Sequence, residues 1–209
     1  LKNLQKLIIE SEKLKKLPGS IGDLIQLEKI NISTGNFGKS ELTSIPASIG
    51  SLQKLKVLKL SSTSINALPA QICNLKTLEK LSVYGSNISK LPENIGDLKN
   101  LKYVQIGNSE LTELPISMKK LDALQTLNIR QNPIRIINSE LLSELENLKH
   151  INLSFCTSLN KRIFLQKTLI VINQLPKIQT LSLKYRSDYF TNDEIKKIRQ
   201  LLKNADLRY

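Results

Sequence analysis

The sequence is poor in the residues that build most active sites and disulfide frameworks. Its 209 residues include no Trp, one His, one Met and two Cys. Two cysteines exclude a disulfide-rich scaffold, and the single His150 leaves no His pair for a metal and no obvious set of general bases. No run of 18 apolar residues occurs, so the sequence predicts no membrane-spanning helix. We therefore expect no catalytic site, no cofactor and no metal, and hence that the chain is not an enzyme.

Two aliphatic residues dominate the remainder. There are 38 Leu and 25 Ile among 84 hydrophobic residues. Such a bias indicates one structural position that is filled again and again, which is the signature of an internal repeat.

A short phrase confirms that the chain is repetitive. Leu-Pro-x-x-Ile begins at Leu17, Leu68 and Leu91, and variants begin at Ile45 and Leu114. Each phrase precedes a Leu-x-x-Leu-x-x-Leu-x-Leu pattern with small variations. The second Leu of this pattern, or its equivalent, falls at Leu4, Leu27, Leu55, Leu78, Leu101, Leu124, Leu148 and Ile178. The intervals are 23, 28, 23, 23, 23, 24 and 30 residues, which indicates eight repeats.

The pattern within one repeat predicts a strand and a return segment. Leu81 and Val83 alternate with polar residues, as in a short strand that is buried on one face. Strands that recur in one direction must pair in parallel, which requires a crossover of about a dozen residues or more. Pro92 favours an irregular return segment because it has no N–H and a fixed φ. Stacked repeats then bury the apolar edge that one repeat alone cannot.

These residues resemble the leucine-rich repeat family, in the subclass with a Leu-Pro-x-x-Ile-Gly-x-Leu return segment that occurs in bacterial and Ras-group-related proteins. The resemblance implies an α/β fold, a curved right-handed solenoid with a parallel sheet on its concave face and a C-terminal helix cap. It implies a single domain over residues 1–209. The family's turn Asn is replaced in most repeats, so we expect a weaker hydrogen-bond ladder there. That position reads Glu12, Gly35, Thr63, Ser86, Ser109, Asn132, Cys156 and Arg186.

The regular spacing is interrupted in two places. The 28-residue interval contains Ser33–Lys39, in which two glycines predict a protruding turn. Phe37 either fills a Leu position or is exposed at the tip of that turn. The 30-residue interval contains Asn160–Pro176, whose apolar spacing predicts a helix in place of the extended return segment.

The two ends of the chain differ. Residues 187–209 predict a C-terminal cap, because Thr191–Glu194 is a capping-box pattern before an amphipathic stripe. The last five residues, from Ala205, predict a final short strand. The first four residues repeat the mid-repeat Leu98–Leu101, so we expect the natural chain to continue upstream of Leu1.

The two cysteines occupy repeat positions. Cys73 lies where other repeats have Gly, and Cys156 lies at the turn Asn position. They are about four repeats apart, or roughly 19 Å at ~4.8 Å per strand, which exceeds the ~7 Å Cα separation that a disulfide allows. We expect two buried structural thiols.

The repeat register also predicts which side chains face the concave side. These positions hold Lys, uncharged polar residues and several of the nine aromatic residues, a mixture that protein interfaces use. We predict that partner binding involves Lys29, Asn31, Lys59, Tyr84, Tyr103, Gln105, Asn128, Arg130, His150, Asn152, Phe155 and Tyr185.

Three functions are compatible with this surface. We expect a non-catalytic protein-interaction module that binds on its concave face. Recognition of a carbohydrate or cell-surface polymer, or substrate reading for a larger enzyme or effector, are the alternatives. The net charge of +13 favours an acidic or polar protein partner, and the spread of Lys around the repeats disfavours specific nucleic-acid binding. Either the cytoplasm or export from a bacterium is compatible with the sequence.

Overall fold

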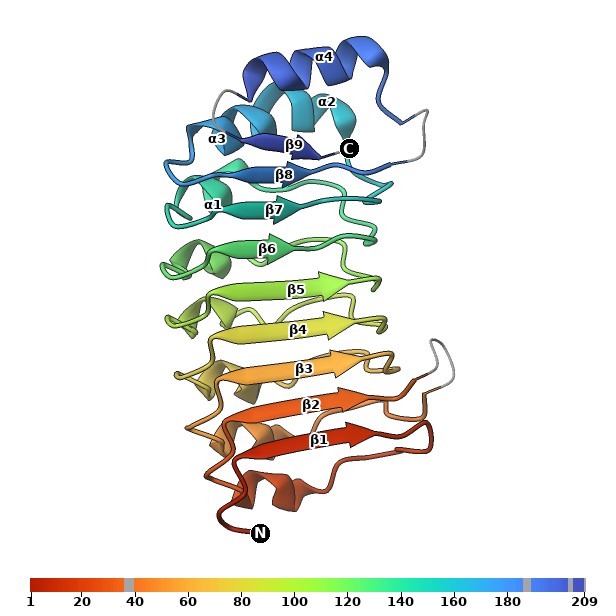
Figure 1. Cartoon of the computed structure of the whole chain (residues 1–209), viewed down its shortest axis with the longest axis vertical. Helices are drawn as coiled ribbons and strands as arrows, with labels where there is room; N and C mark the ends of the chain where they lie inside the picture. Colours follow the sequence, from red (N-terminus) through yellow and green to blue (C-terminus); the bar gives the residue numbers. More distant parts are fainter. Residues whose placement is uncertain (36–39, 186–188, 203–204, 209) are drawn as a thin grey trace.

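The computed structural model describes residues 1–35, 40–185, 189–202 and 205–208, which form one elongated stack (Figure 1). Within these ranges, nine strands make one parallel sheet in which each strand is hydrogen-bonded to the next along the chain. The strands are β1 (Lys6–Glu10), β2 (Lys29–Ser33), β3 (Val57–Ser61), β4 (Lys80–Tyr84), β5 (Tyr103–Gly107), β6 (Thr126–Asn128), β7 (His150–Asn152), β8 (Thr180–Ser182) and β9 (Asp206–Arg208). This confirms the predicted solenoid, and β9 confirms the final short strand.

All nine strands share one register, so equivalent positions of successive repeats lie side by side. Leu58 pairs with Leu81, which pairs with Val104, and all three are buried in the core. Their neighbours along each strand, such as Lys59, point to the other side of the sheet. Up to β8, the helices in the segments that connect the strands lie on the core side of the sheet (Figure 1). We call the side turned away from them the open face; it is the side that the repeat pattern assigns to the concave surface.

The return segments differ from the irregular segments expected from the sequence. Each forms a short 3₁₀ helix, because the Pro carbonyl accepts a hydrogen bond from the N–H three residues later. Ile49 N–H donates to Pro46 C=O at 3.0 Å, and this turn directs the Ile49 side chain into the core. The 3₁₀ helices are η1 (Gly19–Asp23), η2 (Ala47–Ser51), η3 (Ala70–Asn74), η4 (Ile95–Asp97) and η5 (Ile116–Lys120).

Longer helices replace the 3₁₀ helices toward the C-terminal end. α2 (Lys161–Ile163), the π-helical η6 (Phe164–Thr168) and α3 (Leu169–Gln174) run continuously between β7 and β8. They confirm the helix predicted over Asn160–Pro176. A further helix, α1 (Ser139–Ser143), lies between β6 and β7 and was not predicted.

The last helix, α4 (Asn192–Leu201), confirms the predicted capping box. Thr191 Oγ1 accepts a hydrogen bond from Glu194 N–H at 3.2 Å, and Glu194 Oε2 accepts one from Thr191 N–H at 2.9 Å. The α4 helix lies across the end of the stack beside α2 and α3 (Figure 1). Glu194 also forms an ion pair with Lys161 in α2 at 3.1 Å, so the cap is joined to the repeat that it covers.

The turn that follows each strand has the weaker ladder expected from its sequence. Asn132 Nδ2 donates to the carbonyls of Ile106, Ile129 and Arg130, and its Oδ1 accepts from Leu111 N–H. The smaller substitutes in other repeats make fewer bonds. Ser86 and Ser109 hydroxyls bond to one another at 2.9 Å, and Cys156 Sγ contacts the Ile129 carbonyl at 3.2 Å. The buried Thr63 Oγ1 has no hydrogen-bond partner among the described residues.

Some sequence predictions fall outside the described residues. The insertion is described only as far as Gly35, so Phe37 and the tip of the predicted turn lie beyond it. Arg186 and five residues of the predicted cap also lie outside; these cap residues are Ser187, Asp188, Lys203, Asn204 and Tyr209.

Candidate binding surface on the open face

Three columns of side chains cover the open face, at positions that the repeat register predicts to face the concave side. We name them the leading, central and trailing columns, in the order in which each strand meets them. The leading column is Lys6, Lys29, Val57, Lys80, Tyr103, Thr126, His150, Thr180 and Asp206; the central column is Ile8, Asn31, Lys59, Ser82, Gln105, Asn128, Asn152, Ser182 and Arg208. The trailing column runs through Ser33, Ser61, Tyr84 and Gly107 and continues through Arg130 and Ser154, whose carbonyls accept from the N–H groups of the preceding repeats.

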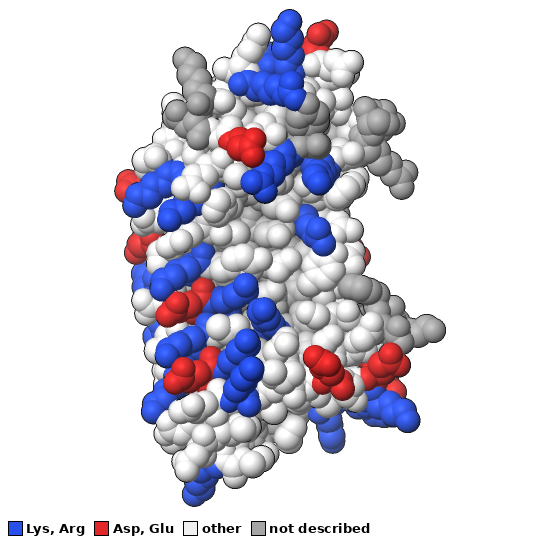
Figure 2. All heavy atoms as spheres, in the orientation of Figure 1, with Lys and Arg blue, Asp and Glu red and all other residues white. Residues whose placement is uncertain are grey.

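Lysines gather over the N-terminal half of this face (Figure 2). Lys29, Lys59 and Lys80 come from three neighbouring strands, and we call them the lysine cluster. The pKa of Lys80 is lowered, first by burial and then by the positive charges of Lys59 and Lys29. The positive charges of Lys59 and Lys29 thus disfavour the charged form of Lys80.

The lysines at the amino-terminal edge of the sheet are neutralised instead. Lys56 forms an ion pair with Glu28 at 3.0 Å, and Lys102 forms one with Glu79 at 2.9 Å. Figure 2 shows these alternating positive and negative side chains beside the open face. Among the described residues, no ion pair joins a member of the lysine cluster to a carboxylate.

Tyr103 borders the lysine cluster. The Lys80 ammonium lies 3.9 Å from the centroid of the Tyr103 ring, a cation–π contact. The Tyr103 hydroxyl donates to Gln105 Oε1 at 3.2 Å, and Ser82 Oγ donates to the same oxygen at 2.9 Å. Burial raises the pKa of Tyr103, so it stays a neutral phenol. This network fixes an uncharged polar surface beside the cations.

A second aromatic group spans three successive repeats at the trailing column. Arg130 Nη2 donates to the Tyr84 hydroxyl at 2.8 Å, and that hydroxyl donates to Gln131 Oε1 at 3.0 Å. Gly107 lies between the two on β5. A Cβ there would be 2.9 Å from Tyr84 Cδ2, so the missing side chain makes room for the contact. We call this arrangement the Tyr84–Arg130 bridge.

The C-terminal half of the face contains a shallow hollow of about 230 Å³. The His150 Nδ1 and Thr180 Oγ1 atoms lie 2.9 Å apart within it. Asn128 and Asn152 direct their Oδ1 atoms to backbone N–H groups two residues later, those of Arg130 and Ser154. The hollow is lined by Thr126, Asn128, His150, Ile151, Asn152, Thr180, Ser182 and Arg208. Arg208 was not among the predicted binding residues, although the alternation in β9 continues the central column.

Two predicted binding residues lie away from these columns. Phe155 is exposed just beyond the trailing column, with a φ of 60° that belongs to the turn. Tyr185 packs in the cap, where its ring stacks on Tyr189 at 4.1 Å and its hydroxyl donates to the Leu153 carbonyl at 2.9 Å. Tyr185 thus contributes to the core of the cap and does not extend the open face.

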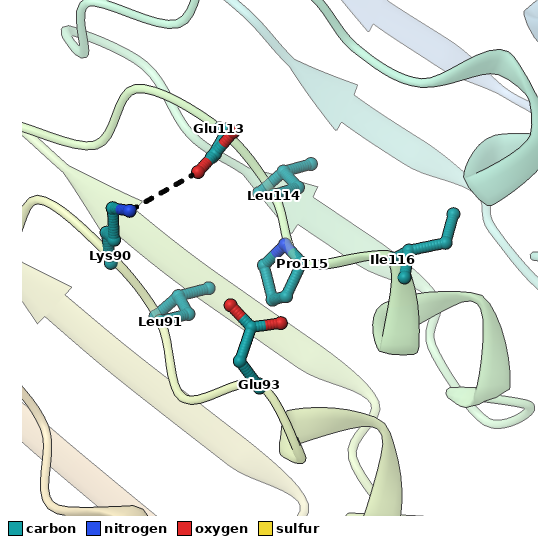
Figure 3. Close-up of a pocket in the computed structure, with 7 residues that line it drawn as sticks. All are labelled: Lys90, Leu91, Glu93, Glu113, Leu114, Pro115 and Ile116. Atoms are coloured by element: carbon teal, nitrogen blue, oxygen red, sulfur yellow. Dashed lines mark ion pairs between the residues drawn. The ribbon is translucent and has the colours of Figure 1, made fainter.

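The opposite side of the molecule carries a different pocket, between two successive Leu-Pro turns (Figure 3). Leu91 and Glu93 line one wall, and Leu114, Pro115 and Ile116 line the other. The ion pair between Lys90 and Glu113, at 3.7 Å, lies at its edge. The pocket measures about 270 Å³. Its walls are parts of the repeat itself, since they are the segments that fill the core behind the sheet.

Cys73 and Cys156 are both buried and unpaired, as predicted, and burial raises the pKa of each thiol to about 11. In the described ranges, no group of three or more His, Cys, Asp or Glu residues could hold a metal ion. Nor does any described helix have the length and apolar character needed to cross a membrane.

Several solved structures share this fold. The leucine-rich repeat domain of the type III effector XopL is 20% identical over 97% of this chain and 75% of that chain, with a TM-score of 0.75. A leucine-rich repeat protein of Leptospira interrogans is 23% identical over 100% of this chain and 73% of that chain, with a TM-score of 0.54. The Arabidopsis receptor kinase HAESA, in complex with the peptide hormone IDA and the co-receptor SERK1, is 20% identical over 85% of this chain and 28% of that chain, with a TM-score of 0.58.

Sequence comparison leads to the same family. No curated protein sequence matches the chain. The profile of the family described as "Leucine-rich repeat region" matches residues 40–208, more than three quarters of the chain. Together with the repeat register and the parallel sheet, this match shows that the chain belongs to the leucine-rich repeat family.

Proposed function

We propose that this chain is a protein-interaction module, without a catalytic step of its own, that binds its partner on the open face of the sheet. The leucine-rich repeat fold is in general a protein–protein interaction module. In a related fold, the receptor kinase HAESA forms a complex with a peptide hormone and a co-receptor. These likenesses support protein binding as the class of function.

The character of the open face carries this proposal. The inward columns are almost entirely Leu, Ile and Val, because they fill the core. The open face instead presents a lysine cluster, the Tyr84–Arg130 bridge and a polar hollow on one continuous surface. Cations beside aromatic rings and amides are the groups that protein interfaces use as energetic anchors. None of them is needed to close the core.

The alternative functions have less support. The hollow at β6–β9 is polar enough for a carbohydrate, but neither Tyr nor Phe is among the residues that line it. A role in reading substrates for a larger enzyme or effector is one form of the same protein binding and would use the same face.

A pair of photo-crosslinking experiments tests the proposal. A benzoyl-phenylalanine replaces Val57 or Thr126 on the open face, or Glu93 in the pocket on the opposite side, and each protein is irradiated in an extract of the source organism. We expect the same discrete partner to be captured from Val57 and Thr126 and not from Glu93. Capture from Glu93 alone would place binding on the opposite side and overturn the proposal.

A further inference from the structure

Resting on the proposed function, we propose that the lysine cluster, with Lys6 beside it, is the docking site for an acidic, extended segment of the partner protein. Lys6, Lys29 and Lys80 lie in the leading column of β1, β2 and β4, and Lys59 lies in the central column of β3. Four neighbouring strands thus each contribute one cation to the same face.

The spacing of these lysines sets the length of the segment. At ~4.8 Å between strands, β1 and β4 are about 14 Å apart. An extended peptide advances about 3.3 Å per residue, so about five residues span the cluster. Side chains of an extended peptide alternate, so carboxylates at the first, third and fifth residues face the lysines together.

The lysine cluster has no carboxylate partner of its own among the described residues. Across β2–β5, no position of the three columns holds Asp or Glu. Lys59 and Lys29 lower the pKa of Lys80 by mutual repulsion, after burial. Carboxylates that bind here relieve this repulsion, whereas they would gain little at Lys56 or Lys102, which already have Glu28 and Glu79.

The extent of the cluster favours an acidic peptide over a nucleic acid. A nucleic-acid groove tracks the phosphate backbone with positive charge over many nucleotides. Here the lysines of the leading and central columns stop at β4, next to the uncharged network of Ser82, Tyr103 and Gln105. Glu10 adds a negative charge at the trailing end of β1. A short carboxylate-bearing segment followed by uncharged residues fits this pattern.

The test is a titration of the whole chain with a designed peptide. Binding is monitored through the amide chemical shifts in NMR spectra. The probe is acetyl-Gly-Ser-Glu-Ser-Glu-Ser-Glu-Gly-amide, and its control replaces each Glu with Gln. We expect shifts in β1–β5 with the Glu peptide, an affinity that falls as NaCl rises, and at least tenfold weaker binding of the Gln peptide. Equal binding of both peptides would overturn the proposal.

Charge-matched variants assign the site. We expect the triple variant Lys29→Gln, Lys59→Gln and Lys80→Gln to weaken binding at least tenfold. The control variant Lys56→Gln, Lys76→Gln and Lys102→Gln removes the same charge from ion-paired lysines, and it should change the affinity no more than twofold. Equal losses in both variants would mean that net charge alone drives binding, which overturns a specific site.

Two further arms separate the class of partner. The first arm measures binding of a ten-nucleotide oligo-thymidine, and the second measures binding of vesicles with one-third anionic lipid. If either bound tenfold more tightly than the Glu peptide and depended on the same lysines, the proposal of an acidic peptide partner would be overturned. Photo-crosslinking from position 126 in the triple variant of Lys29, Lys59 and Lys80 distinguishes the acidic docking site from the general proposal that the open face binds a protein. If capture from Thr126 persists undiminished, the open face still binds a protein but the acidic docking site is wrong.

Discussion

At the scale of single residues, the turn after each strand shows how much one side chain can contribute. Asn132 satisfies four backbone groups of the turn, three carbonyls and one N–H. Thr63 occupies the same repeat position and makes no hydrogen bond through its hydroxyl within the described chain. Because a buried polar group without a partner is costly, the two positions should respond oppositely to apolar substitution.

We predict that Asn132→Ala lowers the free energy of unfolding by about 2–4 kcal/mol, since buried backbone groups lose their partner. Thr63→Val should leave it unchanged or raise it by up to about 1 kcal/mol, because it removes an unsatisfied hydroxyl. Urea denaturation followed by circular dichroism measures both, with the m-value as a check that the unfolded state is unchanged. A Thr63→Val protein less stable by more than 1 kcal/mol would show that this hydroxyl is bonded in solution.

The sequence predicted on which face of the sheet a side chain lies better than it predicted the contacts that the side chain makes. Lys59 and Gln105 lie in the predicted columns because a strand alternates its side chains. The Tyr84–Arg130 bridge was not predicted, since it joins residues 46 apart across a glycine on an intervening strand. Tyr185 went to the cap because two other aromatic side chains were there to pack against it.

At the scale of elements, the fit between successive return helices depends on glycine. A Cβ on Gly96 in η4 would lie 1.9 Å from the carbonyl oxygen of Ser117 in η5. A Cβ on Gly19, at the start of η1, would have no atom within 4 Å. The neighbours of Gly96 are backbone atoms, which cannot move aside as a flexible side chain would.

We predict that Gly96→Ala destabilises the protein by about 3 kcal/mol, because the methyl group must displace the backbone of η5. Gly19→Ala is the matched control and should stabilise by about 0.4–1 kcal/mol through the unfolded state. Thermal unfolding of the two variants beside the parent tests this. The idea fails if Gly96→Ala unfolds at the parental temperature, because η5 would then have moved aside to accept the methyl group.

Elements were predictable where their pattern repeats. The strands and the helix from Asn160 to Pro176 show a clear apolar period over many residues. The five residues of α1 are too few for such a period, so the helix went unpredicted. It forms because Asn138 caps it, accepting from Glu140 N–H at 2.8 Å, while Leu141 and Leu142 fill the core.

At the scale of the whole molecule, a stack of repeats is a one-dimensional chain of contacts. Each repeat packs mainly on its neighbours, so a weak end lets unfolding begin there. The C-terminal end is closed by Phe190, which packs edge-on against the rings of Tyr185 and Tyr189 with centroids 5.3 and 4.9 Å away. Lys161 adds an ion pair and two cation–π contacts to the same cluster.

We predict that Phe190→Ala lowers the stability of the cap by about 3–5 kcal/mol, the usual loss for a buried Phe. Amide hydrogen exchange should accelerate in β7–β9 and stay slow in β3 and β4, because the loss is local. Phe155→Ala is the control, since that ring is 41% exposed and its loss should change stability by no more than about 0.5 kcal/mol. Uniform acceleration across all strands would show that the stack unfolds as one unit.

The sequence by itself determined the strands, their register and the three columns of the open face. It could do so because two periods are visible in the order of apolar and polar residues. One is two residues within a strand, and the other is about 23 residues between strands. Only the tertiary structure decided which lysines are neutralised. Lys56 meets Glu28 from 28 residues earlier and Lys102 meets Glu79 from 23 residues earlier. Among the described residues, no carboxylate forms an ion pair with the lysine cluster. The sequence gives the number and position of the charged residues. Whether a lysine forms an ion pair depends on which carboxylates the stacked repeats place beside it.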